Sequence, residues 1–232
     1  MSRTTGPKGE QAPKRASAKG DPIRPPGRPK GEHAPKRASA KASALTASPG
    51  TLALPTLDAE RVTLRPLVGD DVYALFGFFS DHEVTRYWSR PPMTHLTQAR
   101  TLLRQIRERY RSGEGMQLGI ERKDDGLLIG TCTLFHFMGQ NRRAELGYVL
   151  GSPYWRQGYM HEALQRLLAY AFDDLGLIRL EADIDPRNEA SERTLLRLGF
   201  VKEGYMRERW IVGDVVSDSA VFGLLRREWT RP

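Results

Sequence analysis

The spacing of the apolar residues changes at Met160, and no other feature of the chain constrains the fold as much. From Met160 to Leu175 the apolar residues recur with helical spacing (i, i+3, i+4, i+7), which places them on one face of a long helix. From Leu177 to Asp185 they alternate with charged residues, as in a strand that buries one face. A long amphipathic helix that leads directly into such a strand predicts a domain in which helices pack on a sheet.

The segments on either side extend this pattern. Asp125-Gly126 between two apolar runs predicts a hairpin turn, and Gly199 suits the end of a helix that follows Asn188. The other expected elements are a strand at 61–67, a short helix capped by Asp70 or Asp71, a helix at 97–111, and strands at 116–121, 127–135, 144–150, 209–212 and 219–225. This order predicts a mixed α/β sheet flanked by helices.

Residues 1–52 differ from the rest in composition. The first 50 residues contain eleven Lys or Arg against three Asp or Glu, so they carry the whole formal net charge of +8. They lack aromatic residues, and the segment 7–19 returns at 29–41 with a single substitution. Such a sequence cannot bury enough apolar surface to offset the entropy of ordering. We predict a disordered basic tail at 1–52, with a duplicated Pro/Lys/Ala segment, and a folded domain at 53–232.

Two roles are open for this tail. Gly27-Arg28-Pro29-Lys30 resembles the core of an AT-hook, which lies in an A·T-rich minor groove, although Pro26 replaces the arginine that normally precedes the glycine. Lysine and arginine runs also bind phosphate backbones without sequence preference. The tail is therefore expected either to bind DNA or ribosomal RNA weakly or to act only as a solubilising extension.

The composition argues against several classes of protein. No run approaches the roughly 20 apolar residues of a membrane span, and the basic N-terminus has no apolar segment after it that would make a secretory signal. The sole cysteine, Cys132, rules out an internal disulfide and argues against a zinc site. We therefore expect no membrane contact, no metal, and a reducing, cytoplasmic setting.

A strand, a turn of small and basic residues, and a helix start come together between Gly147 and Met160. Unpaired backbone N–H groups at a helix N-terminus bind phosphate through hydrogen bonds and the helix dipole. Gly158 would allow such a ligand to approach closely because it has no Cβ. Taken alone, Gly158 is equally consistent with a tight turn.

The segment Trp155-Arg156-Gln157-Gly158-Tyr159-Met160-His161-Glu162-Ala163 resembles the acetyl-CoA signature of the GNAT superfamily. It is most similar to the branch that contains the ribosomal-protein N-terminal acetyltransferases (RimJ/RimL-like). Two further motifs match at family spacing, Ala144–Tyr148 and Asn188–Phe200. Trp155 stands where Gln or Arg is usual, and Met160 where Gly or Ala is more common. The resemblance spans about residues 55–230 and implies an α+β GNAT fold, a mostly antiparallel twisted sheet of about six to seven strands with about four helices.

This resemblance implies acetyl-CoA as the acyl donor. The fourth and fifth strands are expected to splay apart, so that backbone amides near Val149 and Leu150 face the thioester and the pantetheine arm. The residues expected to bind acetyl-CoA are Tyr148, Val149, Leu150, Trp155, Arg156, Gln157, Gly158, Tyr159, Met160 and Asn188.

Glu145 stands where several family members place a general base. An unperturbed glutamate has a pKa of about 4.3, so burial would have to raise the pKa for efficient work near neutrality. The alternative is a solvated strand glutamate. Many relatives use a tyrosine seven residues after the asparagine as general acid, and Leu195 occupies that position here. Ser191 matches the serine that some N-terminal acetyltransferases are thought to use instead; alternatively it only satisfies backbone donors in the first helical turn.

Tyr87 and Trp88 fall where the family builds the mouth for the acceptor, and they could equally be core aromatics. A protein α-amine has a pKa near 7.7–8.0, against about 10.4 for lysine, so an enzyme without a strong base uses it more easily. This favours direct attack by a protein N-terminus, possibly ribosomal, in a ternary complex. A small-molecule amine acetyltransferase and a catalytically silent acyl-CoA- or nucleic-acid-binding module are the alternatives. We expect a monomer or a homodimer.

Overall fold

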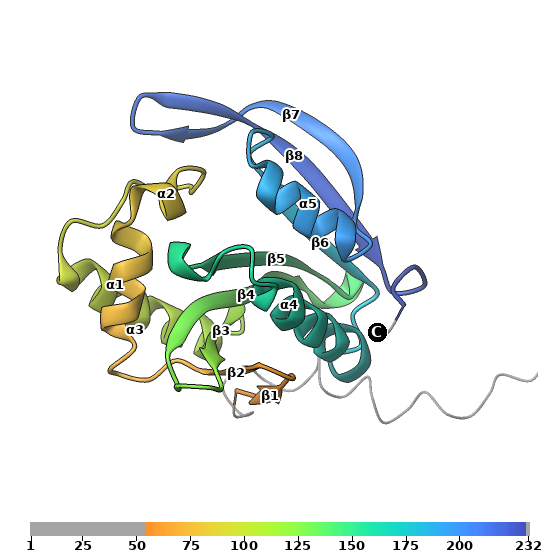
Figure 1. Cartoon of the computed structure of the whole chain (residues 1–232). Coiled ribbons are helices and arrows are strands. Elements are labelled where there is room, and N and C mark those ends of the chain that lie inside the picture. The colour runs from red at the N-terminus through yellow and green to blue at the C-terminus, as the bar shows by residue number, and fades with distance from the viewer. Residues whose placement is uncertain (1–53, 231–232) are drawn as a thin grey trace, which may run out of the picture. The chain divides into compact units, whose positions relative to one another are not determined.

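The computed structural model describes residues 54–230, which form one mixed sheet of eight strands and five α-helices (Figure 1). The expected tail at 1–52, with its duplicated segment and its AT-hook-like motif, lies outside these residues. The strands are β1 (Leu57–Asp58), β2 (Val62–Pro66), β3 (Gly115–Arg122), β4 (Leu128–Met138), β5 (Arg143–Leu150), β6 (Arg179–Ile184), β7 (Val201–Val212) and β8 (Val215–Leu225). The helices are α1 (Val72–Ser80), α2 (His82–Thr85), α3 (Leu96–Ser112), α4 (Tyr159–Ala169) and α5 (Glu189–Arg197).

The strands follow the order β1-β2-β3-β4-β5-β6-β8-β7 across the sheet. Of the described strands, β5 and β6 run parallel and all other neighbours are antiparallel. A parallel pair needs a crossover connection, and α4 supplies it. The mixed, mostly antiparallel sheet of a GNAT fold is thereby confirmed.

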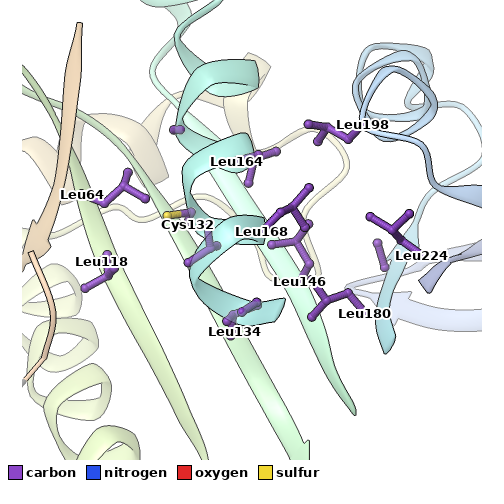
Figure 2. Packing of buried hydrophobic residues seen from close by; sticks show 14 of the residues in the cluster. Leu64, Leu118, Cys132, Leu134, Leu146, Leu164, Leu168, Leu180, Leu198 and Leu224 are labelled. Atoms are coloured by element: carbon purple, nitrogen blue, oxygen red, sulfur yellow. The ribbon is translucent and has the colours of Figure 1, made fainter. Parts of the chain in front are cut away.

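Helices cover both faces of this sheet. Figure 2 shows Leu164 and Leu168 of α4 against Leu146 of β5 on one face, with Leu180 and Leu224 close by. Leu195 of α5 belongs to the same buried cluster. On the other face, α1 and α3 enclose a second cluster, which contains Leu75, Phe78, Phe79, Leu103 and Ile106. Most of β3 and the first half of β4 are buried on both sides, whereas alternate residues of β5 and β6 are only partly buried.

The helix expected from Met160 to Leu175 is present in modified form. α4 ends at Ala169, and a π-helical turn at Tyr170–Asp174 continues it. Phe172 in this turn remains almost fully buried. The apolar period in the sequence therefore marked the buried face correctly but could not show the change in helical pitch.

Asp71 stands at the N-cap of α1 but makes no capping hydrogen bond. Its carboxylate instead accepts hydrogen bonds from Arg65 Nη1 at 2.8 Å, from Arg65 Nη2 at 3.0 Å and from the Val68 amide at 2.7 Å. The expected capping hydrogen bond from Asp71 was therefore wrong. The two hydrogen bonds from the Arg65 guanidinium outcompete the helix amides for this carboxylate. By contrast, the expected turns at Gly126 and Gly199 are confirmed, with φ of +69° and +91°.

The sequence underestimated the last two strands. β7 and β8 begin at Val201 and Val215, well before the limits of 209–212 and 219–225 that we expected. Two register shifts in this hairpin, after Lys202 and after Met206, break the alternation on which strand prediction depends. The very short β1 and α2 account for the strand and the helix beyond the expected numbers. No helix within residues 54–230 is long and apolar enough to cross a membrane.

Replacing Leu168 with alanine should lower the free energy of unfolding by about 2–5 kcal/mol, because it leaves a cavity between α4 and the sheet. Leu168 is fully buried, whereas Leu196 on α5 is 50% exposed. Leu196→Ala is therefore the matched control and should cost far less. Urea unfolding followed by circular dichroism measures both, and equal losses would contradict this description of the core.

Candidate active site

The sheet opens between β5 and β6. The two strands pair at Arg143↔Arg179, Ala144↔Leu180 and Glu145↔Glu181, and beyond Glu145 no further pair forms in the described chain. β6 meanwhile pairs with β8 along its whole length. The expected splay of the two strands is confirmed, and it leaves the second half of β5 with one free edge (Figure 1).

Strand alternation decides which amides face this gap. The Gly151 amide donates to Ile129 O of β4 at 2.9 Å, so the backbone of Gly151, and two residues earlier of Val149, points to β4. The amides of Tyr148 and Leu150 therefore point into the gap. Three strand residues were expected to bind acetyl-CoA. The backbone amides of Tyr148 and Leu150 face the gap, whereas the backbone amide of Val149 faces β4.

The N-terminus of α4 lies at the end of the turn that follows β5. Gly158 is the N-cap residue with φ of +86°, and no side chain caps the helix among the residues described. Arg156 also has a positive φ of 62°. The first-turn N–H groups at Tyr159 and Met160 have no carbonyl within the helix to bond to, so they are available to an anion. The positive φ favours glycine at 158, and a Cβ there would also lie 3.1 Å from Arg61 Nη2.

Arg61 is a site residue that the sequence did not reveal. Its Nε donates to Glu162 Oε2 at 2.8 Å, and its Nη1 donates to Gln157 O at 3.0 Å. Its guanidinium also lies 4.8 Å from the centroid of the Tyr159 ring. Arg61 and Glu162 are 101 residues apart in the chain, so no local pattern could have linked them. The ion pair fixes the start of α4 and places the Arg61 guanidinium beside the helix N-terminus, with its charge offset by Glu162.

The remaining turn residues hold the turn itself. Trp155 Nε1 donates to Leu150 O at 2.7 Å, which uses the carbonyl on the open edge of β5. Gln157 Nε2 donates to Pro153 O at 2.9 Å. The side chains of Trp155 and Gln157 thus stabilise the turn, while the backbone N–H groups of 156–160 remain for a ligand.

Asn188, Ser191 and Tyr148 form one connected group across the gap. Asn188 Oδ1 accepts a hydrogen bond from the Ser191 amide at 3.1 Å and so caps α5. The Tyr148 hydroxyl lies 2.6 Å from Ser191 Oγ. Burial raises the pKa of Tyr148 to about 12, although the hydrogen bond with Ser191 opposes this shift. Tyr148 therefore keeps its proton across the physiological range and can donate it to the serine oxygen.

Glu145 lies where the pairing of β5 and β6 ends. Its Oε1 is 3.0 Å from His136 Nδ1 on β4, and its side chain is 28% exposed. His136 has a positive φ of 50° at an irregularity in the β4–β5 register, which turns its ring toward Glu145. The sequence singled out Glu145 but not His136, because a bulge cannot be recognised from strand alternation.

The two expected mouth residues differ in their surroundings. The Tyr87 ring lies 5.9 Å from the guanidinium of Arg187, which follows β6, so Tyr87 connects α2 with the open end of the sheet. The Trp88 ring lies 5.2 Å from that of Phe79 and packs on the cluster around α1 and α3. Tyr87 thus lies near Arg187 at the open end of β6, whereas Trp88 has the packing of a core aromatic.

An opened sheet beside an uncapped helix N-terminus is the architecture of an acyl-CoA-dependent transferase. Comparison with known families agrees, since the acetyltransferase (GNAT) domain matches residues 61–201. The chain belongs to the GNAT family and is an N-acetyltransferase of this class, whose acyl donor is acetyl-CoA.

The similar proteins agree with this membership. The uncharacterized N-acetyltransferase YoaA of Bacillus subtilis is 37% identical over 173 residues, which are 74% of this chain and 97% of YoaA. The ribosomal protein uS5-alanine N-acetyltransferase of Escherichia coli is 26% identical over 184 residues, 75% of this chain and 92% of the relative. Among solved structures, Mycobacterium smegmatis RimJ in complex with CoA-disulfide has a TM-score of 0.68 at 25% identity and covers 75% of this chain and 88% of that one.

Because the pKa of Tyr148 is raised, the free energy of unfolding should depend on pH in the alkaline range. Between about pH 10 and 12 the unfolded chain loses a tyrosine proton that the folded chain keeps, so the free energy of unfolding falls as pH rises. Tyr148→Phe removes this contribution and should lose less stability over the same range. Urea unfolding of both proteins at neutral and alkaline pH measures the difference, and identical losses would show that burial does not shift this phenol.

Proposed function

We propose that this protein acetylates the α-amine of a protein N-terminus, with acetyl-CoA as donor. The observation that carries the proposal is the free edge of β5 beyond Glu145, which leads toward the uncapped N-terminus of α4. The likeness to an enzyme named for a ribosomal-protein alanine supports a protein acceptor. We further propose that this activity belongs to a domain at 53–232 and that residues 1–52 are an accessory segment.

The chemistry of the site fits acetyl-CoA. In our proposal the backbone N–H groups of 156–160 hold the pyrophosphate, in the cradle that a Cβ at Gly158 would fill. The open-edge amides of Tyr148 and Leu150 bind the pantetheine arm and polarise the thioester carbonyl. Asn188, whose side-chain oxygen caps α5, keeps its amide group for the same arm. When bound, the thioester supplies an acetyl group activated for attack by an amine.

Glu145 and His136 are the proposed path for the proton of the amine. The attacking amine must lose a proton before or as it bonds to the acetyl carbon. A glutamate hydrogen-bonded to an imidazole can accept that proton directly or through one water. The partial exposure of Glu145 leaves room for such a water.

Ser191 is the proposed donor to the departing sulfur, in place of the tyrosine that Leu195 replaces. A serine hydroxyl alone is a poor acid, so its orientation matters more than its acidity. In our proposal the protonated Tyr148 hydroxyl, 2.6 Å from Ser191 Oγ, donates to that oxygen and leaves the serine proton to point elsewhere. Ser191 then stabilises the thiolate by a hydrogen bond, and the sulfur gains its proton from water.

The carboxylates at the open end of β6 are paired with arginines, since Arg187 lies 2.6 Å from Asp185 and Arg209 lies 3.8 Å from Asp183. A hydrogen bond from Arg187 lowers the pKa of Asp185, and one from Tyr205 lowers the pKa of Asp218. Both groups are therefore ionised near neutrality. These paired charges do not by themselves select one kind of amine, so the acceptor assay below includes a polyamine.

The acceptor assay compares three amines at neutral pH. A peptide with a free N-terminal alanine should be acetylated much faster than the same peptide with a blocked N-terminus and one lysine, because its amine has the lower pKa. Spermidine is the third acceptor. Mass spectrometry identifies the acetylated nitrogen, and exclusive use of lysine or spermidine would overturn the α-amine proposal while leaving the donor site intact.

Acetyl-CoA at about 100 times its dissociation constant should stabilise the protein by roughly 2.7 kcal/mol. Gly158→Asp should abolish most of this gain, since it places a side chain and a negative charge in the proposed pyrophosphate cradle. Gly213→Asp is the control, because Gly213 also has a positive φ but lies in the distant β7–β8 turn. Thermal unfolding with and without acetyl-CoA measures the shift, and an unchanged shift in Gly158→Asp would refute the cradle.

A further inference from the structure

Four arginines form a row along α3, at Arg100, Arg104, Arg107 and Arg111. With 3.6 residues per turn their spacing of four, three and four places them within an arc of about 60° on one side of the helix. All four are exposed to solvent. The buried face of α3 carries Ala99, Leu103 and Ile106, so the arginine row borders the core without belonging to it.

The arginine row has almost no neutralising partners in residues 54–230. Arg111 Nη1 lies 3.5 Å from Glu108 Oε2, but both side chains are about 70% exposed, and such pairs contribute little. Arg100, Arg104 and Arg107 make no ion pair or hydrogen bond with any described residue. Like charges at these spacings destabilise a helix, so the row has a cost that protein contacts do not offset.

A hollow of about 260 Å³ lies along the row. Its lining consists of the four arginines with Gly69, Val72 and Leu103. Nothing lies within 4 Å of the position that a Cβ at Gly69 would take, so the rim of the hollow is open on that side. A ligand could therefore lie against α3 and reach several guanidinium groups together.

This charge is local to α3. Residues 51–232 carry equal numbers of basic and acidic residues, whereas α3 has five arginines and one glutamate. α3 packs on the α1 side of the sheet, opposite the face that α4 and α5 cover. The row is thus a cationic surface that does not belong to the proposed acetyl-CoA cradle.

We propose that the arginine row binds the phosphate backbone of a nucleic acid. At a rise of about 1.5 Å per residue the row spans about 16 Å, comparable to about five consecutive phosphates of one strand along a duplex axis. Guanidinium groups match phosphate geometry with paired hydrogen bonds. Contacts of this kind position a protein on nucleic acid and carry no base sequence information.

The test uses the full chain and two duplexes of the same sequence, one of DNA and one of RNA. Fluorescence anisotropy gives the dissociation constants between about 50 and 200 mM NaCl. Arg104→Gln and Arg107→Gln, each made singly, should each reduce the slope of log K against log salt by about 0.9 and weaken binding about fivefold near 0.15 M salt. The basic residues of 1–52 are common to all variants and cancel in the comparison.

Arg197→Gln is the matched control. Arg197 is an exposed arginine at the end of α5, on the opposite layer, and it has no ion pair with any residue of the described range. The control should leave the slope unchanged, and thermal unfolding should show that all variants fold.

Equal effects of Arg104→Gln and Arg197→Gln would overturn the proposal. Weakened binding of a polyglutamate peptide, with unchanged binding of both duplexes, would overturn it in favour of an acidic protein partner. Because no acetyl transfer is measured, the result is independent of the proposed acceptor.

Discussion

The site depends on the point at which β5 stops pairing with β6. Six residue pairs join β6 to β8, and only three join β6 to β5. Beyond the pair Glu145↔Glu181, β6 therefore stays with β8 and separates from β5. Amides along the rest of β5 are left without a strand partner on that edge. In a protein interior such groups are costly unless something bonds to them. The indole of Trp155 satisfies one carbonyl of that edge, and a linear ligand with amide groups could satisfy what remains.

Long-range polar contacts keep this opening in place. Arg61, just before β2, binds both the Gln157 carbonyl and the Glu162 carboxylate, so the first long strand of the domain fixes the start of α4. Tyr148 reaches across the gap to Ser191 at the start of α5. Ser152, in the turn after β5, donates to Asp81 Oδ2 at 2.6 Å and ties that turn to α2. Each of these bonds joins elements that the apolar core alone would leave free to shift.

The fold was predictable because its signals are local. The α4 period, the alternation in β6 and the Gly126 and Gly199 turns each depend on neighbouring residues, and the structure confirms them. The β7–β8 hairpin was underestimated because its register shifts cancel the alternation. The role of Asp71 was misjudged because Arg65 competes for its carboxylate, and that competition exists only once β2 and α1 are adjacent.

For the candidate site, the sequence by itself determined which segments would form it. The motifs around Glu145, Gly158 and Asn188 lie next to the opening because strand, turn and helix follow one another along the chain. Only the tertiary structure decided which groups meet there. It placed Arg61 beside Gly158, His136 beside Glu145 and the Tyr148 hydroxyl on Ser191. It also left Arg100, Arg104 and Arg107 of α3 without a carboxylate partner among residues 54–230. The physical reason is that hydrogen bonds and ion pairs act over a few ångströms in space, whereas the residues that make them lie up to about a hundred positions apart in the chain.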